Sequence, residues 1–366
     1  MRLLLINAVC GYGSTGRIVL DIAKEYEQNG YEVKIAYGRN GECPEEAKKY
    51  AIRIGSDMDV YWHVLYTRLT DKHGLASKLA TNKFLKWADE YNPDVLWLHN
   101  IHGYYINYEM LFDWIKGRPQ MQVRWTLHDC WTFTGHCSHF LYIKCDKWRR
   151  ECCNCLQLDQ YPKSIVDNSS ENYLRKKNAF TGVNNLKIIT PSKWLKNNVH
   201  KSFLCEYESE VIYNKVNLNE FRPISSNFKE EHGIMKKKML LGVANVWNDR
   251  KGLGDFIKLS KLLDSSYYQI VLVGLTRKQI NDLKKKQINI LGMERTTDLN
   301  SLIKIYTAAD VFLNLSYEDT FPTVNLEAEA CGTRVISYDS GGCAETLSLP
   351  ESIVIEADLT EILNYI

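Results

Sequence analysis

The sequence predicts an α/β protein built from two Rossmann-like lobes that face each other across a cleft. Three observations support this prediction. The chain has 366 residues, roughly two domains at about 150 residues each. Short apolar runs alternate with helical patterns, which is typical of parallel βαβ units. This alternation restarts after a connector rich in Asn, Pro and Ser at 211–225.

The N-terminal lobe, residues 1–215, begins with a strand, a turn and a helix. The apolar run RLLLIN is followed by the glycine-rich turn GYGSTG and by a helical pattern that ends at Gly30. Residues 60–91 form a helical pattern broken around Gly74. The other apolar runs predict strands at 32–38, 93–99, 122–129 and 186–192.

The C-terminal lobe, residues 216–366, repeats the pattern. Helices are predicted at 253–263 and from 321 to 332. Strands are predicted at 236–245, 267–274, 288–292, 310–316 and 333–339. Small ligands bind at the carboxyl ends of such parallel strands, so the candidate site residues are those that follow the strands.

Charge and hydropathy exclude several classes of protein. The 46 Lys and Arg against 44 Asp and Glu give a net charge of +2, which disfavours a nucleic-acid partner and an acidic disordered chain. No run approaches the roughly 18–20 apolar residues that span a bilayer. The start of the chain has the pattern of a first strand and not of an export signal, so we expect a cytoplasmic protein.

The glycine-rich turn has the spacing G-x-G-x-x-G between a strand and a helix. Its glycines allow close approach of a phosphate, and the helix N-terminus supplies N–H groups, so the candidate anion-binding residues are Gly13, Ser14, Thr15 and Gly16. One interpretation is an NADP-dependent oxidoreductase. The second strand ends without the usual carboxylate, but Arg39 could hold a 2′-phosphate, and Tyr173-x-x-x-Lys177 imitates a dehydrogenase pair.

A pair of carboxylates frames the start of the helix predicted after 310–316. Asp319 precedes this helix and Glu327 lies about two turns along it. Pro322 suits the first helical turn, and Gly332 marks the end. Sugar hydroxyls need carboxylate acceptors and a diphosphate needs helix N–H groups, so the segment predicts a site for a nucleotide sugar.

These motifs resemble the retaining glycosyltransferases of family 4, which have the GT-B fold. The family carries Glu-x7-Glu followed by A-x-A-C-G-T-P, and this chain has Asp319-x7-Glu327 followed by AEACGT and Arg334. Three more segments are similar to family motifs over nearly the whole chain: VIYNKVNLNEFRP at 211–223, DRKGLGDFIKL at 249–259 and DSGGCAET at 339–346.

The resemblance implies a retaining hexosyltransferase of bacterial capsular, exopolysaccharide or lipopolysaccharide synthesis. A UDP- or GDP-sugar would be the donor and a glycan, free or lipid-linked, the acceptor. Asp319 would contact the donor sugar, Glu327 the ribose, and the backbone of Phe321, Pro322 and Thr323 the sugar or diphosphate, with Gly13–Gly16 closing over it.

The remaining catalytic assignments follow from the same resemblance and from residue chemistry. Arg250 and Lys251 would stabilise the leaving diphosphate, so no catalytic metal is expected, although Asn245 stands where the family has an Arg. His128 matches the active-site histidine of the family. His99 and His102 follow another strand, and we assign them to acceptor binding or to hydrogen bonds within the loop.

Two alternatives within this fold stay open. Asp319 and Asn245 depart from the family pattern, which is compatible with a catalytically inactive protein that binds nucleotide sugars. An epimerase of the same fold would change the sugar configuration without an acceptor.

A cysteine-rich insertion occupies about 130–160. Its spacing, with a closing C-x-x-C, predicts a structural zinc site formed by Cys137, Cys145, Cys152 and Cys155. His136 and His139 are substitute ligands. Reduced thiols and disulfides are the alternatives.

Residues 61–88 mix aromatic side chains with five cations, Arg68, Lys72, Lys78, Lys83 and Lys86. A basic amphipathic face of this kind predicts peripheral contact with the inner face of the cytoplasmic membrane, and a solvated helix face is the alternative.

Overall fold

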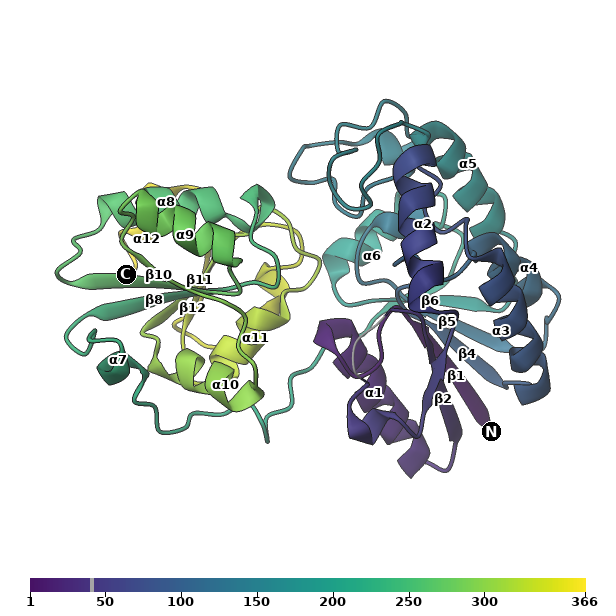
Figure 1. Ribbon diagram of the computed structural model, residues 1–366, viewed down its shortest axis with the longest axis horizontal. Coiled ribbons are helices and arrows are strands. Elements are labelled where there is room, and N and C mark those ends of the chain that lie inside the picture. Colours follow the sequence, from purple (N-terminus) through teal and green to yellow (C-terminus); the bar gives the residue numbers. More distant parts are fainter. Residues whose placement is uncertain (40–42) are drawn as a thin grey trace. The chain divides into compact units, whose positions relative to one another are not determined.

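The computed structural model, which describes residues 1–39 and 43–366, divides into two compact units. Unit 1 is Met1–Tyr213 and unit 2 is Asn214–Ile366. Each unit has one parallel sheet with helices on both faces (Figure 1). The α/β class and the two Rossmann-like units are as the sequence predicts.

Unit 1 is organised around seven parallel strands in the order β3-β2-β1-β4-β5-β6-β7. The strands are β1 (Arg2–Asn7), β2 (Glu32–Tyr37), β3 (Ala51–Arg53), β4 (Val95–Leu98), β5 (Gln122–Thr126), β6 (Leu186–Thr190) and β7 (Ser209–Val211). The helices are α1 (Gly13–Gln28), α2 (Asp57–Thr70), α3 (Lys78–Tyr91), α4 (Tyr108–Lys116), α5 (Ser169–Phe180) and α6 (Lys193–His200), with short 3-10 turns η1 (Glu45–Ala47), η2 (Trp131–Phe133) and η3 (Lys147–Arg149).

Unit 2 has six parallel strands in the order β10-β9-β8-β11-β12-β13. The strands are β8 (Lys238–Val243), β9 (Tyr268–Val273), β10 (Ile290–Met293), β11 (Val311–Asn314), β12 (Val335–Tyr338) and β13 (Ile353–Ile355). The helices are α7 (Phe228–Glu231), α8 (Leu253–Leu262), α9 (Arg277–Lys285), α10 (Leu299–Ala308), α11 (Thr323–Ala330) and α12 (Leu359–Ile362), with 3-10 turns η4 (Asp249–Lys251) and η5 (Ala344–Thr346).

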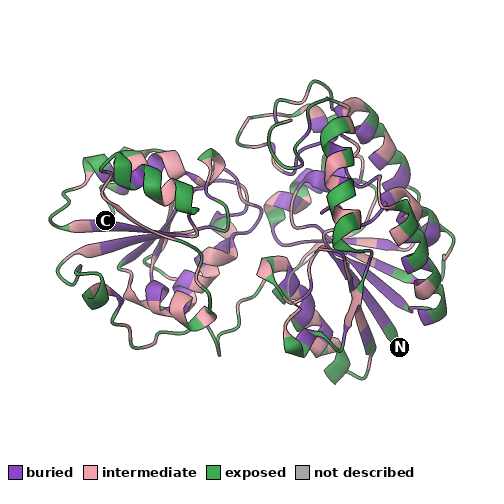
Figure 2. Ribbon diagram, viewed as in Figure 1, coloured by how far each residue is buried: buried purple, intermediate pink, exposed green. Residues whose placement is uncertain are grey.

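Burial on both faces explains why strands such as β1 and β4 are nearly continuous apolar runs. Figure 2 shows the strands as mostly buried, while the helices expose one side. Leu3 and Leu5 of β1 pack on the side of α1, whereas Leu4 and Ile6 pack on the side of α3 and α4. A strand covered on both faces has no polar side, so it is a continuous apolar run in the sequence.

The break predicted around Gly74 separates α2 from α3. Ser56 begins α2 with a capping box in which its side chain accepts from the Asp59 N–H. Asp71 ends the helix in the left-handed conformation, with φ of 56°. In the part of the chain that the structure describes, none of the helices has both the length and the apolar character needed to span a membrane.

Candidate active site

The site residues of unit 2 follow the carboxyl ends of β8 and β11, where close packing depends on two glycines. Gly252 follows η4 with φ of +74°, and a Cβ there would lie 2.2 Å from the carbonyl oxygen of Leu315. Gly341 has φ of +62°, and its Cβ would lie 2.0 Å from the carbonyl oxygen of Asp319. Only glycine fits these positions, so three loops converge beside Asp319.

Lys251 and Asp319 form an ion pair at this convergence. The Lys251 Nζ contacts Asp319 Oδ2, and the two side chains are only 19% and 18% exposed. The other carboxylate oxygen, Oδ1, accepts from the Phe321 N–H at 3.2 Å. The sequence prediction that these residues share a site therefore has a geometric basis. Partial burial makes both charges act more strongly than they would at the surface.

Arg250 contacts backbone atoms, whereas the neighbouring Lys251 pairs with Asp319. Its Nη1 donates to the carbonyl oxygen of Glu318 at 2.6 Å, and its own carbonyl oxygen accepts from the Tyr317 N–H at 2.8 Å. Arg250 thus ties η4 to the turn that carries Asp319. The neighbouring Glu318 is fully buried, so Asp319 is the carboxylate of the two that a ligand reaches.

The N-terminus of α11 lies directly after this turn. Pro322 is the N-cap residue, and its side chain has no acceptor that could cap the helix. Its first N–H groups and its dipole therefore favour an anion. Further along α11, Glu327 Oε2 accepts from the hydroxyl of Tyr306 at 2.9 Å. Tyr306 is fully buried in α10, and the sequence reasoning did not identify it as the residue that orients Glu327.

A cavity of about 410 Å³ opens beyond the ends of β8 and β9. Its lining includes Asn245, Trp247, Gly274, Thr276, Lys278 and Gln279. This volume lies within the range of roughly 300–1,000 Å³ that is usual for small-molecule sites. Asn245, which departs from the family pattern, thus lines a space large enough for part of a ligand.

The glycine-rich turn of unit 1 connects β1 to α1. Gly11 and Gly13 both have φ of +67°, and the N-cap residue Tyr12 makes no side-chain cap. Asn7 Oδ1 accepts from the Asn100 N–H at 3.2 Å, which fixes the end of β1 beside the loop after β4. The predicted anion-binding residues Gly13–Gly16 therefore form the first turn of α1 at the carboxyl edge of the sheet.

His99 and His128 meet at the ends of the adjacent strands β4 and β5. Nδ1 of His99 lies 3.0 Å from Nε2 of His128, and the two rings are stacked. Burial lowers the pKa of His99 well below its usual value, and the neighbouring His128 lowers it further. Burial also lowers the pKa of His128, to about 4. Both imidazoles are therefore neutral at neutral pH and act as hydrogen-bonding groups.

His102 pairs with Asp129, the residue after His128. His102 Nε2 lies 2.9 Å from Asp129 Oδ2, and its Nδ1 lies 3.0 Å from the hydroxyl of Tyr161. Burial by itself would raise the pKa of Asp129, but the charge and the hydrogen bond of His102 lower it to about 2. The ring of His73 packs against His102 and Tyr161. The sequence reasoning missed His73 and Tyr161, which come from distant segments.

The buried histidines predict a loss of stability in acid. The pKa of His128 is near 4 in the folded chain and near 6.5 when unfolded, so the unfolded state binds the extra proton between these values. His128 therefore stabilises the fold above pH 6.5, and roughly 3 kcal/mol of this contribution is lost by pH 4. We expect urea unfolding to show a shallower decline between pH 6.5 and 4 in His128→Gln than in the wild type. The control is His200→Gln, at an exposed histidine; equal slopes for His128→Gln and the wild type would contradict this assignment.

The features that suggested an oxidoreductase have other roles. A Cβ on Gly38, at the end of β2, would lie 2.0 Å from Cβ of Tyr105, so Tyr105 occupies the space above this strand end. Arg39 lies over the ring of Tyr104, 5.8 Å from its centroid. Tyr173 is buried in α5 against Phe203. These contacts account for the residues as packing elements.

Two protein-family models match the chain. The model described as "Glycosyltransferase Family 4" matches residues 15–220, and the model described as "Glycosyl transferases group 1" matches residues 225–359. Together they span most of both units.

Curated relatives and a solved structure point in the same direction. A protein of Escherichia coli K12 named "Putative colanic acid biosynthesis glycosyl transferase WcaC" is 22% identical over 95% of this chain and 85% of its own length. An N,N'-diacetylbacillosaminyl-diphospho-undecaprenol alpha-1,3-N-acetylgalactosaminyltransferase of Campylobacter jejuni is 27% identical over 36% of each chain. The structure of HepE (Alr3699) of Anabaena in complex with UDP-glucose matches with a TM-score of 0.64 and 15% identity, over 100% of this chain and 89% of that chain.

Proposed function

Because this chain belongs to glycosyltransferase family 4, we propose that it moves a sugar from a nucleotide-sugar donor to a hydroxyl group of a glycan acceptor. Its two Rossmann-like units are those of the GT-B fold. The observation that carries the proposal is the Lys251–Asp319 pair beside the N-terminus of α11. A cation, a carboxylate and a helix N-terminus together match a diphosphate joined to a sugar.

The donor is proposed to bind in unit 2 with its diphosphate at the start of α11. Lys251 would turn from Asp319 toward the phosphates, and Asp319 would accept hydrogen bonds from the sugar hydroxyls. Glu327, held by Tyr306, would accept from the ribose hydroxyls. The glycine-rich turn of unit 1, Gly13–Gly16, is proposed as an anion-binding turn, because the N-terminus of α1 favours negative charge. Since HepE was solved with UDP-glucose, a UDP-sugar is the first donor to test.

The transfer is proposed to retain the anomeric configuration. The bond between the anomeric carbon and the β-phosphate oxygen breaks, and the acceptor oxygen bonds to the same carbon on the same face. The acceptor hydroxyl gives its proton to the leaving phosphate. Lys251 and the N–H groups of α11 stabilise the charge on that phosphate, and His128 donates to a donor-sugar hydroxyl. NMR of the product should show the donor's configuration; an inverted product would contradict this mechanism.

The acceptor is proposed to be a growing surface polysaccharide, carried on a lipid. WcaC is named for colanic acid biosynthesis and the Campylobacter relative for an undecaprenol-linked acceptor. His99 and His102 lie at the carboxyl edge of the sheet in unit 1, where they would contact acceptor hydroxyls.

A thermal-shift measurement tests the donor site first. UDP, GDP, ADP and NADP are each added at about 100 times a plausible Kd, where binding should add ~2.7 kcal/mol of stability. We expect one nucleoside diphosphate to raise the Tm by several degrees, with or without EDTA. A shift with NADP alone would contradict the transferase proposal and favour the oxidoreductase. Donor binding without transfer or donor hydrolysis would identify an inactive protein, and a changed sugar configuration without acceptor would identify an epimerase.

Contact with an anionic membrane is proposed for the outer face of α2. Met58, Tyr61 and Trp62 are each about 60% exposed. The Ile165 N–H donates to the Arg68 carbonyl oxygen at 2.9 Å, which brings another exposed apolar side chain beside a cation. This combination suits a lipid–water interface.

Removing two of these aromatic side chains should weaken membrane binding. We expect Tyr61→Ser combined with Trp62→Ser to lower the partition onto anionic vesicles at least ~10-fold, since each buried aromatic contributes about 1.5–3 kcal/mol. Leu262→Ser, at an exposed apolar residue of α8 in unit 2, is the control. Vesicle co-sedimentation measures the partition. If the double variant partitions as the wild type does, this face contacts solvent and not the membrane.

A further inference from the structure

The cysteine-rich segment between β5 and α5 surrounds a small cavity. Its only regular structure is the pair of 3-10 turns η2 and η3, yet its aromatic residues Phe133, Phe140 and Trp148 are buried and stacked on one another. Four cysteines that are distributed over nineteen residues of the segment line one cavity: Cys137, Cys145, Cys152 and Cys155. All four are free thiols.

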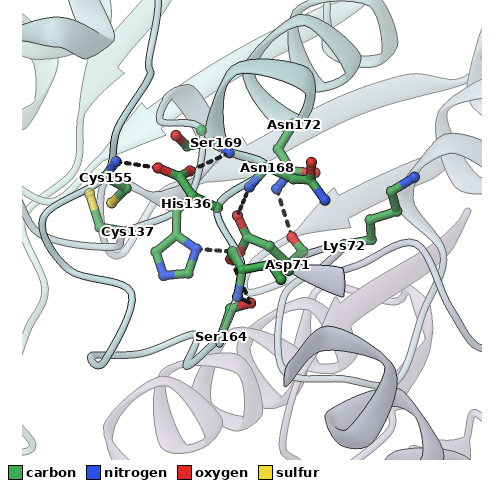
Figure 3. A network of polar contacts seen from close by, with 12 residues as sticks. Asp71, Lys72, His136, Cys137, Cys155, Ser164, Asn168, Ser169 and Asn172 are labelled. Carbon is green, nitrogen blue, oxygen red and sulfur yellow. Dashed lines mark hydrogen bonds and ion pairs between the residues drawn. The ribbon is translucent and has the colours of Figure 1, made fainter. Parts of the chain in front are cut away.

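The sulfur atoms make the contacts expected around a thiolate site. The side chains of Cys137 and Cys155 are hydrogen-bonded to each other, and Figure 3 shows the two sulfurs side by side. The Cys152 Sγ accepts from the Gly135 N–H at 3.2 Å. A Cβ on Gly135 would lie 2.1 Å from the Ser169 carbonyl oxygen, so only glycine allows this N–H to reach the sulfur. Backbone N–H groups that point at sulfur stabilise its anionic form.

His136 lines the same cavity and is oriented by a carboxylate. Its Nδ1 is bonded to Asp71 Oδ1, and both side chains are completely buried (Figure 3). Asp71 in turn accepts from the Asn168 N–H at 2.9 Å. The other ring nitrogen of His136, Nε2, is buried with no hydrogen-bond partner in the described residues. Asp71 therefore fixes the orientation of the His136 ring in the wall of the cavity.

A buried cation stands next to the thiols. Lys176 is 1% exposed, and its Nζ donates only to carbonyl oxygens, those of Trp131 at 2.7 Å and Thr134 at 3.0 Å. Among the described residues, no carboxylate lies within ion-pair distance of this ammonium group. Burial lowers the pKa of Lys176 to about 7, and metal-bound thiolates at Cys152 and Cys137 would favour its charged form.

We propose that this cavity is a structural zinc site whose ligands are the thiolates of Cys137, Cys145, Cys152 and Cys155. Each thiol releases its proton to solvent when the metal binds. Among the residues described, no three potential ligands stand in coordination geometry around one point. Binding therefore requires the cysteine side chains to turn toward the cavity that all four line. Four thiolate ligands leave no open position, so the metal would order the loop and take no part in sugar transfer.

Metal analysis of the purified full chain tests the proposal. After incubation with zinc and desalting, we expect about one zinc ion per chain, released by a thiol-modifying reagent. Cys137→Ser and Cys152→Ser should bind at least ~10-fold less zinc, whereas Cys205→Ser, at an exposed cysteine outside the segment, should bind as the wild type does. A wild-type chain that retains no zinc would overturn the proposal, as would a Cys137–Cys155 disulfide found by mass spectrometry without reduction.

Cobalt substitution tests the site in the wild-type chain itself, so the result does not depend on whether the cysteine variants fold. The wild-type chain reconstituted with Co²⁺ should show the intense charge-transfer and ligand-field absorption of tetrahedral cobalt thiolate. His136→Asn should leave this spectrum unchanged, since His136 is placed beside the ligands and not among them. A changed spectrum in His136→Asn would overturn the four-cysteine ligand set, and weak octahedral bands in the wild type would overturn the site.

Discussion

Replacing Lys251 with alanine is expected to lower kcat/KM for the nucleotide sugar roughly 100- to 1,000-fold, the loss usual for one preorganised charge-stabilising group. Lys251 is the cation that the structure places against Asp319, beside the N-terminus of α11. Its charge would act on the leaving diphosphate, so the larger part of the loss should fall on kcat. Release of the nucleoside diphosphate measures the rate for the donor identified by thermal shift.

Two further variants separate this role from general effects of charge and folding. Lys261→Ala removes the same side chain from the last turn of α8, where it is exposed, and should leave kcat/KM unchanged. Lys251→Arg keeps the charge and should recover part of the activity. If Lys251→Ala retained wild-type kcat while its Tm fell, the ion pair would be structural, and the diphosphate would be stabilised by other groups.

The order of the elements could be predicted because the central strands are buried on both faces. Such strands are nearly continuous apolar runs, and this signal identified β1, β4 and β8 directly from the sequence. The strands β3, β7 and β13 were not predicted. Each has three residues, of which at most one is buried. A run this short has no periodicity that separates it from a loop.

The two parts of the candidate site differ in how many of their residues can be predicted from the sequence. Asp319 and Glu327 lie in one continuous turn and helix, so their spacing alone indicates a shared ligand. His102 instead depends on Tyr161, which is 59 residues away in sequence. No local pattern connects such residues, because the contact exists only once the loops have packed. The same limit applies to Tyr306, whose bond to Glu327 joins two helices.

Two glycines beside the candidate site have a structural role that the sequence motifs alone do not explain. The R-K-G and D-S-G-G segments stood out as family motifs, but their sequence gives no reason for glycine. The reason is steric: a side chain on Gly252 or Gly341 would collide with the carbonyl oxygen of Leu315 or Asp319. These glycines therefore allow the close packing that positions Lys251 and Asp319.

Replacing Glu327 with glutamine is expected to raise KM for the donor ~10- to 100-fold while kcat changes little. Glu327 is assigned to the ribose hydroxyls, and a hydrogen bond to a charged group contributes about 1.5–3 kcal/mol. The ribose is remote from the bond that breaks, so this interaction has the same strength in the ground state and the transition state. Initial rates over a range of donor concentrations separate KM from kcat.

Tyr306→Phe tests how Glu327 is positioned. It removes only the hydroxyl that donates to Glu327 Oε2 at 2.9 Å. Without this bond the carboxylate is less well oriented, and this should raise the donor KM ~2- to 10-fold, less than its replacement does, and leave kcat unchanged. Glu351→Gln, at an exposed carboxylate of the same unit, is the control for charge. If Glu327→Gln instead lowered kcat at an unchanged KM, the carboxylate would act at the reacting carbon. Glu327 and Asp319 would then have exchanged the roles assigned to them here.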